Sequence, residues 1–294
     1  MKQYKILALA LLILAGAAGC VPALREAPDL HQVADAVSEA EAEARYREAL
    51  DLFATRRDEA VRQAGTLLRE SAGSLDDPTA ALLSLVEVLV WQVEHEPDPN
   101  SREDLATGAV HAGQWCLDAS PERPACRYRL AIAVGVQARE RPGTGVDAMP
   151  LMIELLEAAR AAGPELDHGG PDRVLALLYL RAPGWPTGPG DPDLGYERAL
   201  AAAGIAPDFP PNQLVLGEAL AAVDREEEAA EAYRAALVLA EALQESGGRD
   251  AREWRREAES ALAGMGARHL SHPPKQGKKG SGASVPEGER VRKC

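Results

Sequence analysis

Residues 167–173 read DHGGPDR and bring together the residue types in this chain that most resemble a reactive site. A His beside an Asp and two Gly is compatible with a reactive loop, such as the HGG turn of a hydrolase, or with a loop that holds a ligand. A structural interpretation competes with both. Pro171 suits a first helical turn, Gly169 and Gly170 allow the chain to turn, and Asp167 can accept backbone N–H groups.

The motifs that would complete a catalytic centre are missing from the sequence. There is no G-x-S-x-G elbow to supply a nucleophile and no G-x-x-x-x-G-K-[ST] loop to hold phosphates. The HEPDP stretch at 95–99 is not a zinc-binding H-E-x-x-H, because Pro97 would break the helix that this motif needs. We therefore expect no catalytic residue, no metal site and no cofactor, and predict that the protein is not an enzyme.

The first twenty residues have the pattern of a bacterial lipoprotein leader. Lys2 and Lys5 precede an apolar core at 6–14, and AAGC then ends at Cys20. This core is too short for an ordinary membrane span. We expect cleavage of a signal peptide, residues 1–19, and acylation of Cys20; an ordinary secretory signal with a chance cysteine is the alternative. Val21 in place of Asp favours the outer membrane of the cell envelope, facing the periplasm.

The charge distribution argues against one class of partner. The formal net charge is −14, and the tail 266–294 carries a net +5 of Lys and Arg over Glu. Without this tail and the two leader lysines, the body 20–266 has a net charge near −21. Such a surface repels phosphates, which excludes nucleic acid binding. The tail is rich in Gly, Lys, Ser and Pro and is predicted to be disordered.

The rest of the chain predicts helices. After a tether at 20–32, residues 33–265 alternate apolar-periodic segments with short Pro/Gly/Asp breaks, while aromatic residues make up only 4% of the chain. Residues 182–192, APGWPTGPGDP, form a loop that no helix can cross. The EPDPNS break at 96–101 offers Ser101 as a helix N-cap. Trp91 and Trp115 fit a helical core better than a ligand-stacking role.

An internal repeat defines the expected architecture. Residues 212–236 contain Leu-Gly-x-x-Leu followed by Ala-x-x-x-Tyr, which resembles the tetratricopeptide pattern. Small residues at the matching place in three helix pairs, Gly135, Ala176 and Gly217, are 41 residues apart. A HEAT-type repeat has a similar period and is the alternative. We predict an all-α fold, a right-handed solenoid of tetratricopeptide-like helix pairs, closed by a capping helix at 249–264.

Two cysteines flank a predicted turn between helices. Cys116 and Cys126 stand on either side of LDASPERPA, and ten residues across one turn is compatible with disulfide distances. An oxidising periplasm would favour a disulfide. Two buried thiols remain the alternative.

Residues 166–220 resemble a known family when their features are taken together. These features are the GGP-x-R helix start, a loop of aromatic and Pro residues, GDP, a P-D-F-P-x-N link and a following L-x-L-x-E-x-L. The stretch looks like the TatT family, the tetratricopeptide lipoproteins associated with TRAP transporters. The expected lipobox and acidic helical body fit that resemblance.

The resemblance implies a function and a set of residues. It implies a periplasm-facing accessory subunit that partners a TRAP-type substrate-binding protein and helps deliver a small organic ligand, without covalent chemistry. It also implies that one group of residues shapes the inner surface or a pore, with two more at the rim: His168, Gly169, Gly170, Pro171 and Arg173, then Trp185 and Asp191. The alternative is a generic tetratricopeptide scaffold for protein–protein interaction in the bacterial envelope.

Overall fold

The fold was obtained as a computed structural model that describes residues 24–33, 36–248 and 250–271. In these residues the regular structure is helical, and the β-type pairing is one isolated bridge between Gly184 and Gly190. The principal helices are α3 (Glu39–Ala54), α4 (Asp58–Ala72), α5 (Thr79–His95), α6 (Pro99–Ala119), α7 (Pro124–Glu140), α8 (Gly145–Ala162), α9 (Gly170–Arg181), α10 (Pro192–Ile205), α11 (Pro210–Ala222), α12 (Glu226–Glu245) and α13 (Ala251–Ser271). The short helices are α2 (Leu30–Val33) and the 3₁₀ turn η1 (Pro142–Thr144). The predicted all-α class is confirmed.

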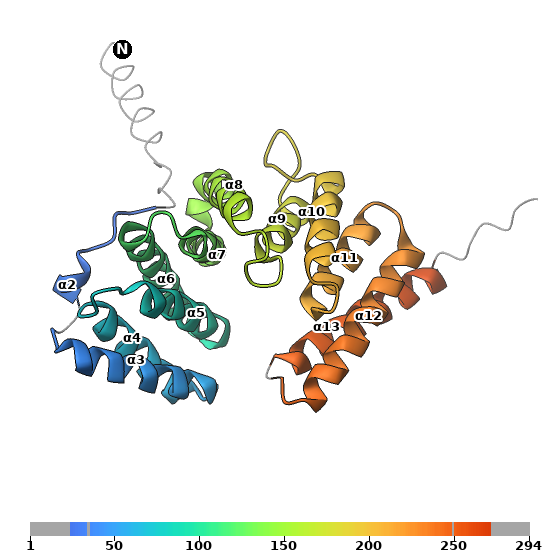
Figure 1. Cartoon of the computed structure of the whole chain (residues 1–294). Helices are drawn as coiled ribbons and strands as arrows, with labels where there is room; N and C mark the ends of the chain where they lie inside the picture. The colour runs from blue at the N-terminus through green and yellow to red at the C-terminus, as the bar shows by residue number, and fades with distance from the viewer. Residues whose placement is uncertain (1–23, 34–35, 249, 272–294) are drawn as a thin grey trace, which may run out of the picture.

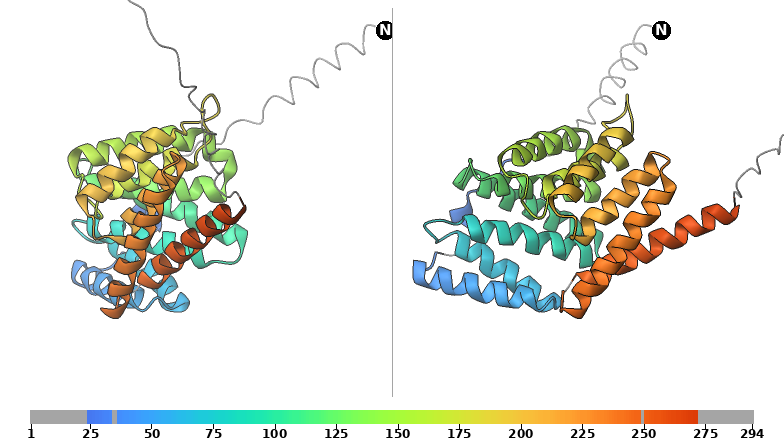
Figure 2. Two further views of the ribbon diagram at one scale, coloured as in Figure 1. Left: turned by 90° about the vertical axis from the view of Figure 1, so that its right-hand side faces the viewer. Right: turned by 45° about the vertical axis from the view of Figure 1, so that its right-hand side comes forward.

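The helices pack as consecutive pairs, α3 with α4 through α11 with α12, and α13 closes the series. The first helix of each pair also contacts the first helix of the next pair, so α5, α7, α9, α11 and α13 form a continuous inner row. Figure 1 shows the resulting arch, with α3 at one end and α13 at the other, and Figure 2 shows the same arch from two further sides. The predicted solenoid of helix pairs is therefore present.

Local sequence signals set most of the helix starts. Proline occupies the first turn of α6, α7, α10 and α11, where its missing N–H is harmless. The predicted N-cap at Ser101 is wrong by one turn. Asp98 caps α6, and its carboxylate accepts from the Ser101 N–H at 2.8 Å. The helix begins at Pro99, before the residue that the predicted Ser101 cap would have made its first.

Small residues let the paired helices approach each other. A Cβ on Gly217 of α11 would lie 2.7 Å from the Tyr233 ring of α12. A Cβ on Gly135 of α7 would lie 2.8 Å from the Met152 methyl of α8. The repeat signal in the sequence therefore marks real helix crossings, and the Tyr233 ring lies against Gly217 inside its own helix pair.

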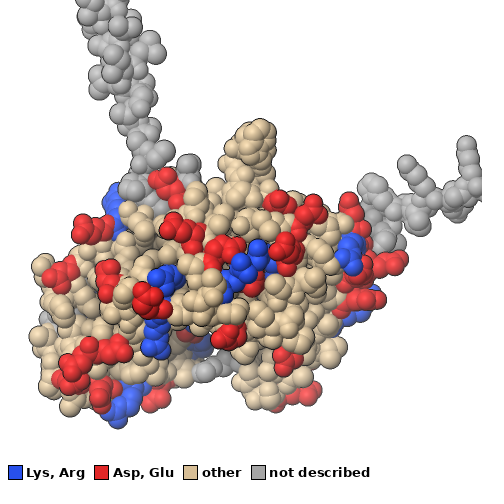
Figure 3. Space-filling model, turned by 45° about the horizontal axis from the view of Figure 1, so that its top comes forward, with Lys and Arg blue, Asp and Glu red and all other residues tan. Residues whose placement is uncertain are grey.

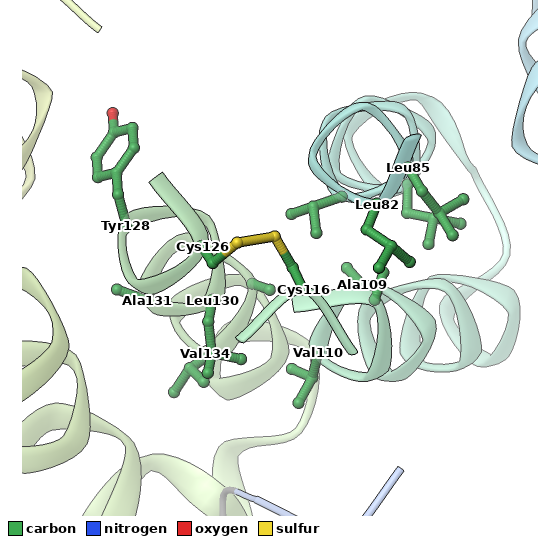
Figure 4. Close-up of a cluster of buried hydrophobic side chains, with 14 of the residues drawn as sticks. Leu82, Leu85, Ala109, Val110, Cys116, Cys126, Tyr128, Leu130, Ala131 and Val134 are labelled. Atoms are coloured by element: carbon green, nitrogen blue, oxygen red, sulfur yellow. A yellow bond between two sulfur atoms is a disulfide. The ribbon is translucent and has the colours of Figure 1, made fainter. Parts of the chain in front are cut away.

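The largest apolar cluster runs from α3 to α9, and a disulfide lies within it (Figure 4). Cys116 lies in the last turn of α6 and Cys126 in the first turn of α7, with their Cα atoms 5.4 Å apart and both side chains buried. In Figure 4 the Tyr128 hydroxyl points away from this cluster. The bond joins the second helix pair to the third.

Two boundaries differ from those predicted. The predicted tether lies against the body: Gln114 Nε2 donates to the Arg25 carbonyl at 2.9 Å, and Trp115 Nε1 donates to the Pro28 carbonyl at 2.7 Å. The last helix runs to Ser271, beyond the predicted end of the helical region at residue 265. The expected signal peptide, Cys20 and most of the basic tail lie outside the described residues.

Candidate functional site

The DHGGPDR stretch forms the sharp turn between α8 and α9. Asp167, His168 and Gly169 follow one another with φ of 48°, 58° and 82°, all in the left-handed region. Gly169 adopts this conformation without steric cost, whereas Asp and His need support from their surroundings. A Cβ on Gly170 would clash with the Tyr128 hydroxyl. The two glycines are thus required by backbone geometry and close packing.

A polar network that is buried except for Asp167 supplies the support for this turn. Arg173 Nη2 donates to Asp167 Oδ2 at 2.7 Å, and Arg173 Nη1 donates to the Asp167 carbonyl and to Asn212 Oδ1, both at 3.0 Å. Tyr128 donates its hydroxyl to the same Asp167 Oδ2 at 2.6 Å. We call Tyr128, Asp167, Arg173 and Asn212 the brace, because they join α7, the turn, α9 and α11.

Asn212 completes the brace from α11. Its side chain is fully buried, and Nδ2 lies 2.8–3.0 Å from three carbonyl oxygens, those of His168, Ala202 and Ala206. An amide nitrogen has two N–H groups, so it shares them among these acceptors. One residue thereby fixes both the α8–α9 turn and the end of α10.

The brace is built for stability and not for proton transfer. Burial, followed by the negative charge of Asp167, raises the pKa of Tyr128, so its hydroxyl remains a donor at physiological pH. The Arg173 side chain is largely buried and directed into the brace. Of the residues that the family resemblance implies, Gly169, Gly170, Pro171 and Arg173 are buried here.

An aromatic row covers the outer side of the brace. The His168 ring stacks on Phe209 with centroids 4.4 Å apart, and Phe209 meets Trp254 edge-on at 5.4 Å. The Arg173 guanidinium lies 5.1 Å from the centre of the Phe209 ring. His168 is exposed and Phe209 and Trp254 are half-buried, so the row is accessible from outside. The sequence marked Phe209 only as part of a link and Trp254 only as part of a cap.

The two predicted rim residues lie at the other end of α9. Trp185 lies on the loop between α9 and α10, with 90% of its surface exposed. Asp191 caps α10, and its Oδ1 accepts from the Leu194 N–H at 3.0 Å. The twelve residues of α9, at about 1.5 Å each, span about 18 Å between His168 and this loop. His168 and Trp185 therefore do not form one pocket.

A groove elsewhere on the surface was not predicted. Helices α4 and α6 lie on either side of α5, and α5 packs against both of them. The N-terminal halves of α4 and α6 flank a pocket of about 530 Å³, which we call the open half of the α4–α6 groove. Its lining combines apolar and charged groups, among them Arg62, Thr66, Arg69, Leu89, Trp91 and Asp104.

The C-terminal half of the same groove is occupied by the chain itself. Residues 25–31, which we call the strap, lie beside Trp115 and Ala72 there. Side-chain donors from α6 bind the strap through its carbonyls, and His31 Nδ1 is 3.0 Å from the Gly73 carbonyl at the end of α4. Trp91 and Trp115, predicted as core, each line one half of the groove.

Charged side chains of both signs line the open half. Arg69 lines the open half and forms no ion pair within the described parts of the chain. Burial and the charge of Arg69 lower the pKa of His111 on the facing helix, so His111 is neutral near pH 7. Trp91 stacks on His95 with centroids 3.8 Å apart, which gives the pocket a flat aromatic wall. This lining suits a ligand with an acidic group and an apolar group.

Comparisons with known proteins add little to this picture. No family model matches the chain, and no curated protein matches it. Among solved structures, it is similar to one described as "Crystal structure of MamA protein", at 16% identity with a TM-score of 0.41. The match covers 70% of this chain and 94% of that chain. Similarity at this level says nothing about activity or partners, and the resemblance to the TRAP-associated family remains a prediction.

The described helices also bear on membrane topology and metals. None of them is long and apolar enough to span a bilayer. Within the same residues, no three His, Cys, Asp or Glu side chains are grouped as metal ligands.

Proposed function

We propose that the protein is a helical-repeat scaffold whose α4–α6 groove binds an extended segment of a partner protein. The observation that carries this proposal is the strap, an irregular segment that runs into the start of α2 and is already seated in one half of that groove. A second segment in the open half would continue along the same two helices and the same α5 floor.

The open half defines the chemistry of the segment it would take. The unpaired Arg69 guanidinium favours a carboxylate, because a charge-assisted hydrogen bond is stronger than a neutral one. Trp91 and Leu89 offer apolar surface for a neighbouring side chain. The partner segment is therefore an extended peptide with an acidic residue next to an apolar or aromatic one.

The sequence alone supports the location and the candidate partner. The AAGC pattern at Cys20 supports a lipid anchor in the bacterial envelope, on the outer membrane facing the periplasm. The family resemblance supports a TRAP-type substrate-binding protein as the partner, with delivery of a small organic ligand as the purpose. The generic alternative is another envelope protein that presents the same kind of segment.

Site-specific photocrosslinking in the native envelope tests the proposal. A photoreactive residue replaces the exposed Thr66 in the open half, and a second one replaces Val238 on α12 as a matched control. We expect Thr66 to crosslink one partner through a short segment that Val238 does not reach. A substrate-binding protein as that partner would support the TRAP assignment.

A synthetic peptide of the crosslinked segment then tests the groove chemistry. Arg69→Glu and Trp91→Ala should each weaken its binding at least tenfold. Arg47→Glu on exposed α3, which changes the charge equally, should leave it unchanged. Equal binding to all these variants, or equal crosslinking from Thr66 and Val238, would refute the proposal.

A further inference from the structure

The loop between α9 and α10 is the most prominent apolar projection of the described surface. Residues 182–190, APGWPTGPG, contain no charged side chain. The loop stands out from the helical body in Figure 1, and Figure 3 shows it as a knob without Lys, Arg, Asp or Glu. Trp185 is 90% exposed, whereas the other tryptophans of the chain are half-buried.

Internal hydrogen bonds give the loop a defined shape. The Gly190 N–H donates to the Pro183 carbonyl at 2.8 Å, and Thr187 Oγ1 donates to the Gly184 carbonyl at 2.9 Å. The Asp191 N–H ties the base of the loop to the Tyr179 carbonyl at 2.9 Å. A Cβ on Gly188 would lie 2.6 Å from the Pro183 carbonyl oxygen. The loop therefore closes on itself, and the Trp185 side chain lies on its outside.

The described chain starts on the same side of the molecule. Figures 1 and 2 show both the loop and the first described residues at the upper side of the arch. Leu24 is four residues after Cys20 in the sequence, a distance that extended chain spans in at most about 14 Å. An acyl anchor on Cys20 would hold this side of the protein close to the bilayer.

We propose that residues 182–190 are a membrane-contact loop, in which Trp185 enters the headgroup region of the bilayer that carries the lipid anchor. Tryptophan is enriched at this depth because its ring is apolar and its N–H is polar. The loop has no cation for anionic lipids, and the acidic Asp191 and Asp193 follow it directly. The favoured partner of the loop is therefore a surface of zwitterionic lipids, which has no net charge. This inference rests on the lipid anchor of the proposed function, but not on the groove.

Fluorescence in vesicles tests the contact in the full acylated chain. Cys294→Ser removes the terminal thiol, and Cys116 and Cys126 are bonded to each other. Thr187→Cys, labelled with an environment-sensitive dye, then reports on the loop, and labelled Val238→Cys reports on an exposed site of α12. In phosphatidylcholine vesicles we expect a blue shift at residue 187 and at least threefold stronger quenching by headgroup spin-labelled lipids than at residue 238.

Further variants and conditions separate the possible outcomes. Trp185→Ser should lower the quenching at residue 187 at least twofold. Anionic lipid in the vesicles should lower this quenching further. Equal quenching at residues 187 and 238, in protein whose Cys20 acylation is confirmed by mass spectrometry, would overturn the loop contact and leave the groove proposal intact. An unmodified Cys20 would overturn both the anchor and the contact. A blue shift that appears only when a partner protein is added, without vesicles, would assign the loop to a protein pocket instead.

Discussion

The strongest quantitative prediction concerns Asn212→Ala. The substitution removes one acceptor of Arg173 Nη1 and the donor shared by three carbonyl groups, two of which are buried. Asn212 is fully buried, so the lost hydrogen bonds are not simply replaced by surface water. The helix α11 itself should tolerate the change, because Ala is a better helix former than Asn.

The expected loss follows from the contacts. Each of the three carbonyl oxygens keeps a second donor, and Arg173 Nη1 keeps the Asp167 carbonyl, so the substitution leaves none of these groups unpaired. A neutral hydrogen bond contributes about 0.5–1.5 kcal/mol, and a hydrogen bond to a charged donor contributes about 1.5–3 kcal/mol. Two N–H groups and one charged contact therefore predict a fall of about 2.5–6 kcal/mol in the free energy of unfolding. Domains typically have only about 5–15 kcal/mol in total, so this is a large effect.

Urea unfolding followed by circular dichroism measures this loss. Gln213→Ala is the matched control, because this neighbouring amide makes one exposed bond, to the Pro207 carbonyl at 2.8 Å. We expect the control to change stability by less than about 0.5 kcal/mol. A loss below about 1 kcal/mol for Asn212→Ala, or equal losses for both variants, would refute the brace as a major source of stability.

Asn212→Asp tests how the stability of the brace depends on pH. The new carboxylate would face three carbonyl oxygens, so its pKa should be higher in the folded than in the unfolded state, despite Arg173. An acid with a raised folded-state pKa gains stability as the pH falls below that value. Asn212→Asp should therefore be less stable than Asn212→Ala at pH 7 and recover relative to it toward pH 4. A difference between the two variants that does not change with pH would contradict this.

Three further predictions follow from single features. The Cys116–Cys126 bond closes a loop in the unfolded chain and so restricts it; reducing the bond should therefore lower the free energy of unfolding by about 2–3 kcal/mol. Neither cysteine should react with alkylating agents before reduction. The depressed pKa of His111 means that the unfolded chain binds the proton more readily, so stability should fall as the pH drops below about 6.5, and His111→Gln should reduce that slope in urea titrations. Trp185→Ala should leave the melting temperature within about 1 °C of the parent protein, because the side chain is 90% exposed; a larger fall in calorimetry would show that it packs.

The sequence predicted where the helices begin and end but not the role of the turn between α8 and α9. The GGP signal correctly placed the start of α9, because Gly and Pro act on the backbone within one helical turn. It did not reveal that Arg173 points into a brace, since its partner Asn212 is 39 residues away in the chain. Trp185 was expected at the rim of the surface or pore that His168 helps to shape, but α9 separates the two residues by its whole length.

No local sequence pattern could have predicted the α4–α6 groove. Trp91 and Trp115 occupy helical positions that look like core, and only the spacing of α4 and α6 leaves them at the surface. The strap was predicted as a tether because its Pro28 and short length carry no helical signal. Its place depends on donors from Gln114 and Trp115, almost ninety residues later in the chain.

The sequence by itself determined the all-α class, the helix breaks and the repeat interval. These properties depend on proline, glycine and apolar periodicity, which act over a few residues. The tertiary structure decided which side chains meet. Tyr128 reaches Asp167 and Arg173 reaches Asn212 across 39 residues, and Thr79 reaches Ser120 across 41. These separations are equal or close to the predicted interval of 41 residues between repeats, but the contacts exist only because stacked repeats bring neighbouring positions together.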